Sequence, residues 1–139
     1  MSSRITVTHD ILQLYKKTKK ELTDFFMSSR RRVCLTTDSW TSTQNLCYMC
    51  LRIHFIDDNW RLQKKILNFC QVTNRKGDTI GRQIKTCLLD WGIERVFTET
   101  INNASFNDVA ISYLSKVVNN WNGAILGCQN MHLRCNAHI

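Results

Sequence analysis

The sequence contains no proline and only five glycines among its 139 residues. Since proline and glycine mark most linkers, their scarcity argues against several domains joined by flexible segments and against a collagen-like chain. The sequence also lacks any apolar run near the roughly 18 residues that a membrane-spanning helix needs. Its first residues do not form the apolar core of a signal peptide. We therefore expect one soluble, intracellular domain.

Acidic residues are scarce as well, with 11 Asp and Glu against 19 Lys and Arg, and the formal net charge is +8. A basic chain of this size favours nucleic acid as its partner, although a basic surface without a ligand remains the alternative. The seven cysteines are an odd number and are spread through apolar stretches. This distribution favours reduced, buried thiols over a disulfide framework.

The hydrophobic pattern predicts the order helix, strand, hairpin pair, helix, strand, helix. The helices are expected at 10–28, 78–91 and 105–121, and the strands at 33–38, 46–56, 61–72 and 95–101. This order is typical of an α/β fold in which helices cover a sheet of mixed strand direction. We divide the chain into a basic amphipathic helix region, 1–32, and a core, 33–139.

Several local features accompany these elements. Residues 39–42 have the composition of a turn, Asp78 is the expected N-cap of the second helix, and Ser105 with Asp108 resembles a capping box. The apolar side of the first helix is expected to carry Ile11, Leu14, Tyr15, Leu22, Phe25 and Phe26. The remaining core is expected to contain Met49, Leu51, Ile53, Phe55, Leu62, Ile66, Leu67, Ile84, Leu88, Val109, Tyr113 and Val117.

Asp38 is the first candidate for site chemistry, because it ends a strand and would lie near Asn102 if the strands at 33–38 and 95–101 are neighbours. Carboxylates from different strands can hold Mg²⁺ for phosphoryl transfer. Asn102 contributes only a neutral amide, and Glu99 should point away from Asn102 because the two positions differ by an odd number. A plain structural role, in which Asp38 caps the Ser39 turn, stays open.

Two patterns of cysteine and histidine have spacings found in metal sites. Cys47 and Cys50 have the spacing of a zinc or redox pair, but on a strand they point to opposite faces and are expected to be core thiols. His132, Cys135 and His138 are spaced three apart and could bind a metal only if this segment is helical.

DNA phosphates are expected to meet the basic residues of the chain. The candidate DNA-binding residues are Arg30, Arg31, Arg32, Lys64, Lys65, Arg75 and Lys76. Aromatic residues, among them Trp40, Tyr48 and Trp60, lie between these basic positions.

Four motifs occur in order along most of the chain. They are CLTTDSWTS at 34–42, WRLQKKILNF at 60–69, CLLDWGI at 87–93 and NASFNDVA at 103–110. Together they resemble the hAT superfamily of DNA transposases, and in particular its plant branch with BED-type zinc fingers, the Ac-like or sleeper-type proteins.

The resemblance implies a ribonuclease H-like core in which three acidic residues bind two Mg²⁺ or Mn²⁺ ions and cut and join DNA. Asp38 matches the first acid, and Asn102 stands where the second, an aspartate, precedes Asn-Ala-Ser. Cys135 and His138 match a C-x-x-H motif near the active site. The third acid, a glutamate after a helical insertion, is expected to lie beyond this partial core, as are the BED finger and the dimerisation segment.

From this resemblance we expect a catalytically inactive transposase core, or a protein derived from one, that retains non-specific DNA binding in the nucleus. No metal ion is expected to bind productively, since Asp38 alone would face two dications. Two alternatives remain. The chain could be an interaction module that pairs with itself or with full-length transposase-like proteins through exposed Trp60 or Trp121, or a gene fragment without a selected function.

Overall fold

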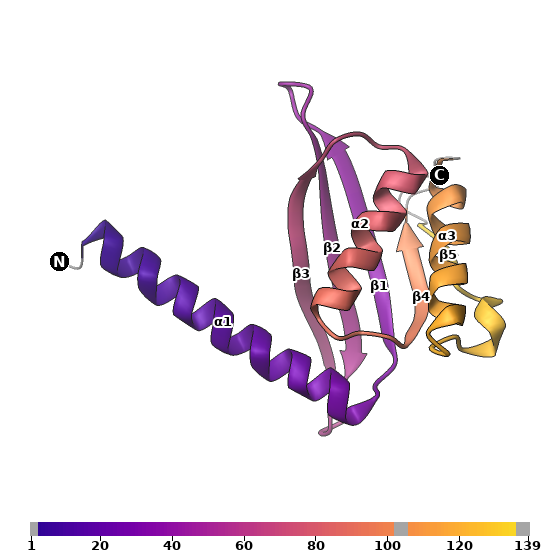
Figure 1. The fold of residues 1–139 in the computed structure, drawn as a ribbon, viewed down its shortest axis with the longest axis horizontal. Helices are drawn as coiled ribbons and strands as arrows, with labels where there is room; N and C mark the ends of the chain where they lie inside the picture. The colour runs from indigo at the N-terminus through magenta and orange to yellow at the C-terminus, as the bar shows by residue number, and fades with distance from the viewer. Residues whose placement is uncertain (1–2, 102–105, 136–139) are drawn as a thin grey trace.

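The computed structural model describes residues 3–101 and 106–135. In this part of the chain, one mixed sheet has the strand order β3-β2-β1-β4-β5 (Figure 1). The strands are β1 (Val33–Thr41), β2 (Cys47–Ile56), β3 (Leu62–Val72), β4 (Val96–Ile101) and β5 (His132–Arg134); the helices are α1 (Arg4–Ser29), α2 (Gly77–Asp90), α3 (Phe106–Asn120) and the short 3₁₀ helix η1 (Leu126–Cys128). β1, β2 and β3 pair antiparallel, whereas β4 and β5 run parallel to β1. The expected α/β fold with a mixed sheet and covering helices is confirmed.

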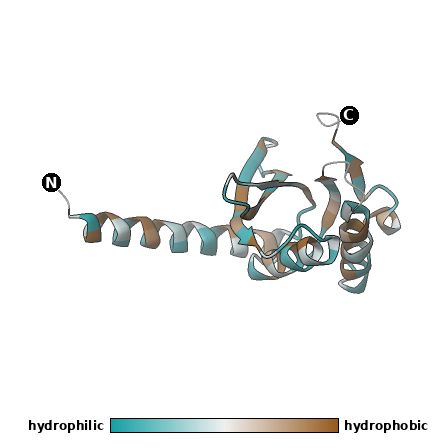
Figure 2. Ribbon diagram, turned by 90° about the horizontal axis from the view of Figure 1, so that it is seen from above, coloured by the Kyte–Doolittle hydropathy of each residue, from teal (hydrophilic) through white to brown (hydrophobic). Residues whose placement is uncertain are grey.

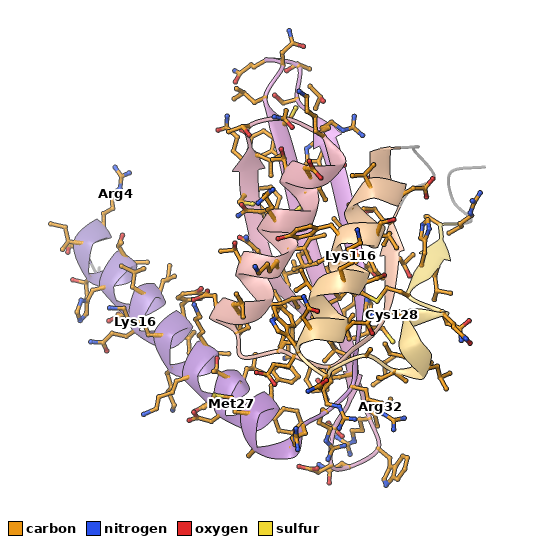
Figure 3. All side chains as sticks on the ribbon, turned by 45° about the vertical axis from the view of Figure 1, so that its right-hand side comes forward. Arg4, Lys16, Met27, Arg32, Lys116 and Cys128 are labelled. Atoms are coloured by element: carbon orange, nitrogen blue, oxygen red, sulfur yellow. The ribbon has the colours of Figure 1, made fainter. Side chains whose placement is uncertain are left out.

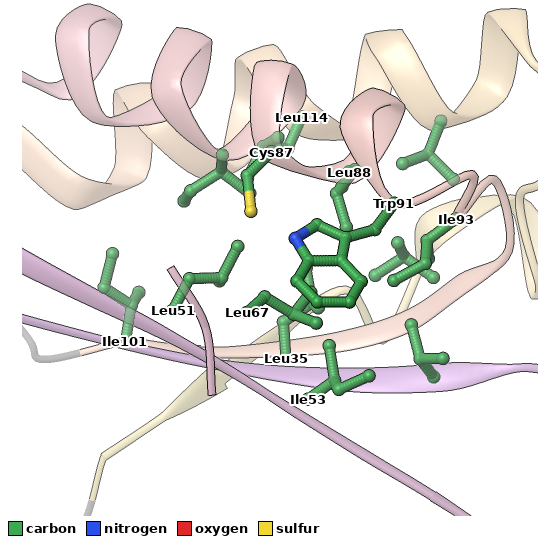
Figure 4. Packing of buried hydrophobic residues seen from close by; sticks show 14 of the residues in the cluster. Leu35, Leu51, Ile53, Leu67, Cys87, Leu88, Trp91, Ile93, Ile101 and Leu114 are labelled. Carbon is green, nitrogen blue, oxygen red and sulfur yellow. The ribbon is translucent and has the colours of Figure 1, made fainter. Parts of the chain in front are cut away.

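Helices α2 and α3 pack on one face of this sheet (Figures 1 and 2). The odd-numbered residues Met49, Leu51, Ile53 and Phe55 of β2 are buried, as the alternating pattern predicts. Figure 4 shows two of them, Leu51 and Ile53, on the side of the sheet that faces the apolar residues of α2. Gly81 permits the close approach of α3, because an added Cβ would come within 2.9 Å of Tyr113 Cδ1. Complete burial of an aliphatic side chain such as Leu51 or Ile53 stabilises the folded state by about 1.5–3 kcal/mol relative to an exposed one.

The opposite side of the sheet is not covered by any helix of the described residues, and we call it the open face. Strand register assigns residues to it, since residues paired across strands share a face. The open face comprises Cys34, Thr36, Asp38 and Trp40 of β1, Tyr48, Cys50, Arg52, His54 and Ile56 of β2, and Leu62, Lys64, Ile66, Phe69 and Gln71 of β3. The expectation that Leu62 and Ile66 enter the core is wrong, since they are 69% and 62% exposed.

Two local boundaries differ from the sequence prediction. Residues 39–41 are not a turn, because Trp40 and Thr41 continue β1 and pair with Tyr48 and Cys47. The real turn follows at Ser42, whose Oγ accepts the backbone N–H of Leu46 at 3.2 Å. A cross-strand aromatic pair therefore outweighs the local turn propensity of this segment.

Helix α2 begins one residue before Asp78, with Lys76 as its N-cap, so the predicted capping role of Asp78 is wrong. The side chain of Asn74 organises this start instead, since its Oδ1 accepts the Lys76 N–H and the Thr79 hydroxyl, each at 2.9 Å. The helix ends before Gly92, which has a φ of +65°, as the sequence predicts.

The inward face of α3 differs only in part from the expected apolar face, which also includes the buried Ala110 and Leu114. Val109 is 50% exposed rather than buried, while Tyr113 and Val117 are only partly buried. Ala110, Ile111, Leu114 and Val118 form the buried stripe. The sequence of α3 has two adjacent apolar stripes, and contact with α2 and the sheet decides which of them is covered. Ser105, of the predicted capping box, lies outside the described residues.

Helix α1 projects away from the sheet (Figures 1 and 2). Only its C-terminal part packs, with the Phe26 ring 5.1 Å from the Phe55 ring and Lys19 Nζ 2.5 Å from Asp90 Oδ2. Ile11, Leu14 and Tyr15, on the expected apolar side of this helix, are 51–65% exposed, because these positions extend beyond the edge of the domain. In the described part of the chain, neither α1 nor any other helix has the length and apolar character needed to cross a membrane.

None of the seven cysteines forms a disulfide, and the expectation that they are buried holds for Cys50 and Cys87, whereas the other five are partly exposed. Cys47 and Cys50 alternate along β2 and do not form a pair. Strand β5, at residues 132–134, was not predicted. It is short and has no alternating pattern, and its pairing with β4 gives it strand geometry.

Glu99 lies inside the core, although a glutamate side chain is usually charged at neutral pH. It lies on β4 opposite Leu35 and is fully buried. The hydroxyl of Thr37 interacts with its carboxyl group and counteracts the effect of burial on its pKa, but neither carboxylate oxygen makes a well-formed hydrogen bond within the described residues. Burial raises the pKa of Glu99 to about 8, so the carboxyl group is mostly protonated at neutral pH.

This burial predicts that the protein loses stability as the pH rises. Because the pKa of Glu99 is higher in the folded state, the free energy of unfolding should fall between about pH 4.5 and pH 8, by on the order of 5 kcal/mol in the limit of full burial. Urea denaturation at several pH values should show this decline, and Glu99→Gln should remove most of it. Glu94→Gln, at an exposed position, is the control. Equal pH dependence in wild type and Glu99→Gln would contradict the account.

Candidate functional site

Asp38 lies on the open face, opposite Cys50 of β2, and its side chain is 42% exposed. It does not end β1, as the sequence suggested, because the strand continues for three more residues. It also does not cap a turn at Ser39, since Ser39 pairs with Met49 inside the strand. Asp38 is therefore an accessible carboxylate on a sheet surface.

The expected proximity of the two strand ends is supported by the sheet order, because β1 and β4 are parallel neighbours. Their register runs to the pair Thr37 and Ile101, one residue before positions 38 and 102. Asn102 itself lies outside the described residues. On the other side of β4, the backbone N–H of Cys135 donates to the carbonyl of Ile101 at 3.3 Å. The C-x-x-H motif thus begins beside the end of β4, while His138 lies outside the described residues.

Arg52 forms an ion pair with Asp38. Arg52 lies on β2 opposite Thr36, so its side chain emerges on the same face as Asp38 and within reach of the carboxylate. The Arg52 side chain is 28% exposed and the Asp38 side chain 42%, so solvent and salt partly screen the attraction between them. Arg52 cannot be identified as a site residue from the sequence, because its contact with Asp38 depends on the β1–β2 register, which no local pattern specifies.

His54 extends the row of basic side chains along β2. Its Nε2 lies 3.1 Å from the hydroxyl of Thr36. Partial burial, together with the positive charges of Lys64 and Arg52, lowers the pKa of His54 below its usual value of 6.5. The imidazole is therefore mostly neutral at physiological pH, and the positive charge of this row comes from its two neighbours.

The candidate DNA-binding residues fall into separate groups. Arg30, Arg31 and Arg32 lie at the start of β1, near the C-terminal end of α1 (Figure 3). Arg75 and Lys76 follow β3 at the other end of the sheet, where Arg75 donates to the Ser39 carbonyl at 3.4 Å. The nine residues of β1 separate the two ends by roughly 26 Å.

The two lysines between these groups point in different directions. Lys64 pairs with His54 and belongs to the open face, whereas Lys65 pairs with Ile53 and belongs to the face covered by helices. Arg31 is engaged within the protein, since it forms an ion pair with Asp58 and donates to the Ile56 carbonyl. Arg30, Arg32, Lys64, Lys65 and Lys76 are exposed.

The possible metal trio at the end of the chain is not helical where it is described. His132 begins strand β5, and its Nδ1 lies 3.7 Å from Asp108 Oδ1. Within residues 3–101 and 106–135, no group of three or more His, Cys, Asp or Glu side chains is arranged to hold a metal ion.

Comparison with known proteins supports the resemblance seen in the motifs. The family described as the ZBED1 RNase-like domain matches residues 36–129. The chain is 34% identical to the Zea mays protein named "Putative AC transposase" over 100% of this chain and 18% of that protein. It is 32% identical to "Zinc finger BED domain-containing protein RICESLEEPER 2" of Oryza sativa subsp. japonica over 96% of this chain and 19% of that protein.

A third relative is "Zinc finger BED domain-containing protein DAYSLEEPER" of Arabidopsis thaliana, 31% identical over 73% of this chain and 15% of that protein. The chain thus spans less than a fifth of the length of these three relatives. The mixed five-stranded sheet with its helices agrees with the RNase-like description of the matched family. The chain belongs to the family of the ZBED1 RNase-like domain and is a hAT-type, transposase-related protein.

Proposed function

We propose that this chain is a transposase core that binds DNA without cutting it. The observation that carries the proposal is the ion pair between Asp38 and Arg52. Asp38 matches the first acid of the hAT superfamily, and here a guanidinium already balances its charge. The relatives named as transposase and as BED zinc-finger proteins support DNA as the ligand and the nucleus as the place of action.

Two-ion chemistry requires several anionic oxygen ligands around a pair of dications. Asp38 is a single carboxylate, and Arg52 places a fixed positive charge where a dication would have to approach. Asn102 adds an amide without charge. Glu99 does not replace the missing acid, because it is buried on the covered face of the sheet. These residues do not suit a Mg²⁺ or Mn²⁺ pair.

DNA binding follows from the distribution of positive charge. The net charge of +8 is accompanied by exposed basic side chains at both ends of the sheet, such as Arg32 and Lys76. Contacts of this kind attract phosphates without reading bases, so affinity is expected to depend on salt and little on sequence.

The test uses a labelled 20-base-pair duplex and fluorescence anisotropy between about 50 and 200 mM salt. Affinity should fall more than tenfold over this range, and Arg32→Gln should weaken binding about threefold and reduce the salt slope by about one. Lys116→Gln, which removes an exposed charge from the outer side of α3, is the matched control. The same protein should not nick supercoiled plasmid in Mn²⁺. Salt-independent binding, or nicking that Asp38→Ala abolishes, would contradict the proposal.

Association with another chain of this family is a second candidate function, favoured by the projecting part of α1. Ile5, Ile11, Leu12 and Leu14 are more than half exposed there. A helix whose N-terminal turns have no tertiary support is marginally stable in water, and pairing of its apolar side chains would stabilise it.

Sedimentation equilibrium should then show a concentration-dependent dimer, which Leu12→Glu combined with Leu14→Glu should convert to monomer. Lys16→Glu combined with Lys17→Glu changes charge on the same helix without removing apolar surface and serves as the control. A wild-type protein that stays monomeric at about 100 μM would rule out strong self-association of this kind.

A further inference from the structure

The carboxyl group of Glu99 lies between the sheet and the helices that cover it. Glu99 is paired with Leu35 of β1 on one side and with His132 of β5 on the other, and residues paired in this way share a face of the sheet. Its side chain is fully buried, so bulk solvent does not reach the carboxyl group in the folded state. A negative charge on this group must therefore be accommodated inside the core or relieved by opening it.

Beside the apolar side chains of the core, the groups around Glu99 provide no permanent positive charge. On β1 the Thr37 hydroxyl interacts with the carboxyl group, and on β5 the Nε2 of His132 is buried without a hydrogen-bond partner. On α3, Asp108 Oδ1 lies 3.7 Å from His132 Nδ1 and adds a second carboxylate. The titratable side chain among the buried residues of α2 is Cys87, and burial raises its pKa to about 12, so this thiol stays neutral. In the described part of the chain, no lysine or arginine bonds to Glu99.

Strand β5 is the most weakly held of the elements beside Glu99. It has three residues and is the outermost strand on its side of the described sheet. The Glu99 N–H donates to the Met131 carbonyl at 2.5 Å, and the Cys135 N–H donates to the Ile101 carbonyl at 3.3 Å. In the segment 131–135, Met131 is the buried side chain, whereas Leu133 is 47% exposed.

The other elements beside Glu99 are held more firmly. Helix α3 buries Ala110, Ile111, Leu114 and Val118, and β1 is bonded to a strand on each side. Moving either element would expose several apolar side chains, whereas release of the segment 131–135 exposes few. Because the local opening with the lowest free energy is the most populated one, water should reach Glu99 through detachment of β5.

We propose that Glu99 is a proton-dependent switch for β5: the neutral carboxyl group leaves the strand docked on β4, and loss of its proton to solvent releases the segment 131–135 while the rest of the sheet stays folded. The released segment includes Cys135, which is otherwise bonded to the end of β4. Since the pKa of the buried carboxyl group is about 8, release occurs at mildly alkaline pH. The proposal does not depend on DNA binding.

Hydrogen–deuterium exchange of the full chain between about pH 6 and pH 9, with exchange times scaled to the intrinsic rate at each pH, tests this proposal. The protection factor of the segment 131–135 should fall about tenfold or more as the pH rises, because the open state binds fewer protons than the closed state. It should also stay below the protection factors of α3 and β2 throughout. Glu99→Gln retains the size of the side chain without its charge and should reduce the fall to less than about twofold.

Two further variants complete the experiment. Glu99→Met, an apolar side chain of similar length, should also remove the fall, and it replaces Glu99→Gln if circular dichroism shows that the amide prevents folding. Glu94→Gln removes an exposed carboxylate from the loop before β4 and should keep the wild-type response.

Three outcomes would overturn the proposal. A pH response that persists in folded Glu99→Gln or Glu99→Met would assign the titration to another group, such as His132. Constant protection of the segment 131–135 in the wild type would mean that its release does not follow the charge of Glu99. Loss of protection in α3 together with β5 would place the opening in the helix layer instead of at the edge of the sheet.

Discussion

The parallel pairing of β1 with β4, and the antiparallel pairing of β1 with β2, determine where Asp38 lies relative to its neighbours. The first pairing brings position 38 beside the end of β4, and Cys135 lies across β4 on the side of β5. The second places Arg52 within reach of Asp38. Because side chains alternate along a strand, a shift of register by one residue would move the Asp38 partner to the covered face. The site is thus a consequence of sheet register more than of any single motif.

Asp38 and Glu99 lie in the same sheet, but the negative charge of their carboxyl groups is compensated in different ways. Asp38 stays accessible and finds a guanidinium, whereas Glu99 is surrounded by apolar side chains and is protonated instead. The pair with Arg52 is electrically neutral on the open face, and the protonated Glu99 is neutral on the covered face. Glu99 therefore does not offset the excess of Lys and Arg in the chain, whereas Asp38 offsets one arginine.

Much of the fold could be predicted from the sequence, because alternation in β2 and helical spacing in α2 follow directly from which residues are buried. That β1 and β4 are neighbours is only a condition of the site at the level of the sequence, and the sheet order meets this condition. Arg52 could not be assigned to the site, since its partner is far along the chain and depends on register. Leu62 and Val109 were placed in the core wrongly, because an apolar pattern does not reveal which face of a sheet or which stripe of a helix is covered.

The central claim is that the ion pair with Arg52 prevents Asp38 from binding divalent cations. Isothermal titration with Mn²⁺ tests it most directly in wild type, Asn102→Asp, and Asn102→Asp combined with Arg52→Gln. The account predicts no specific binding by wild type, and binding by the double variant at least tenfold tighter than by Asn102→Asp alone. Specific Mn²⁺ binding by the wild type that Asp38→Asn removes would contradict it.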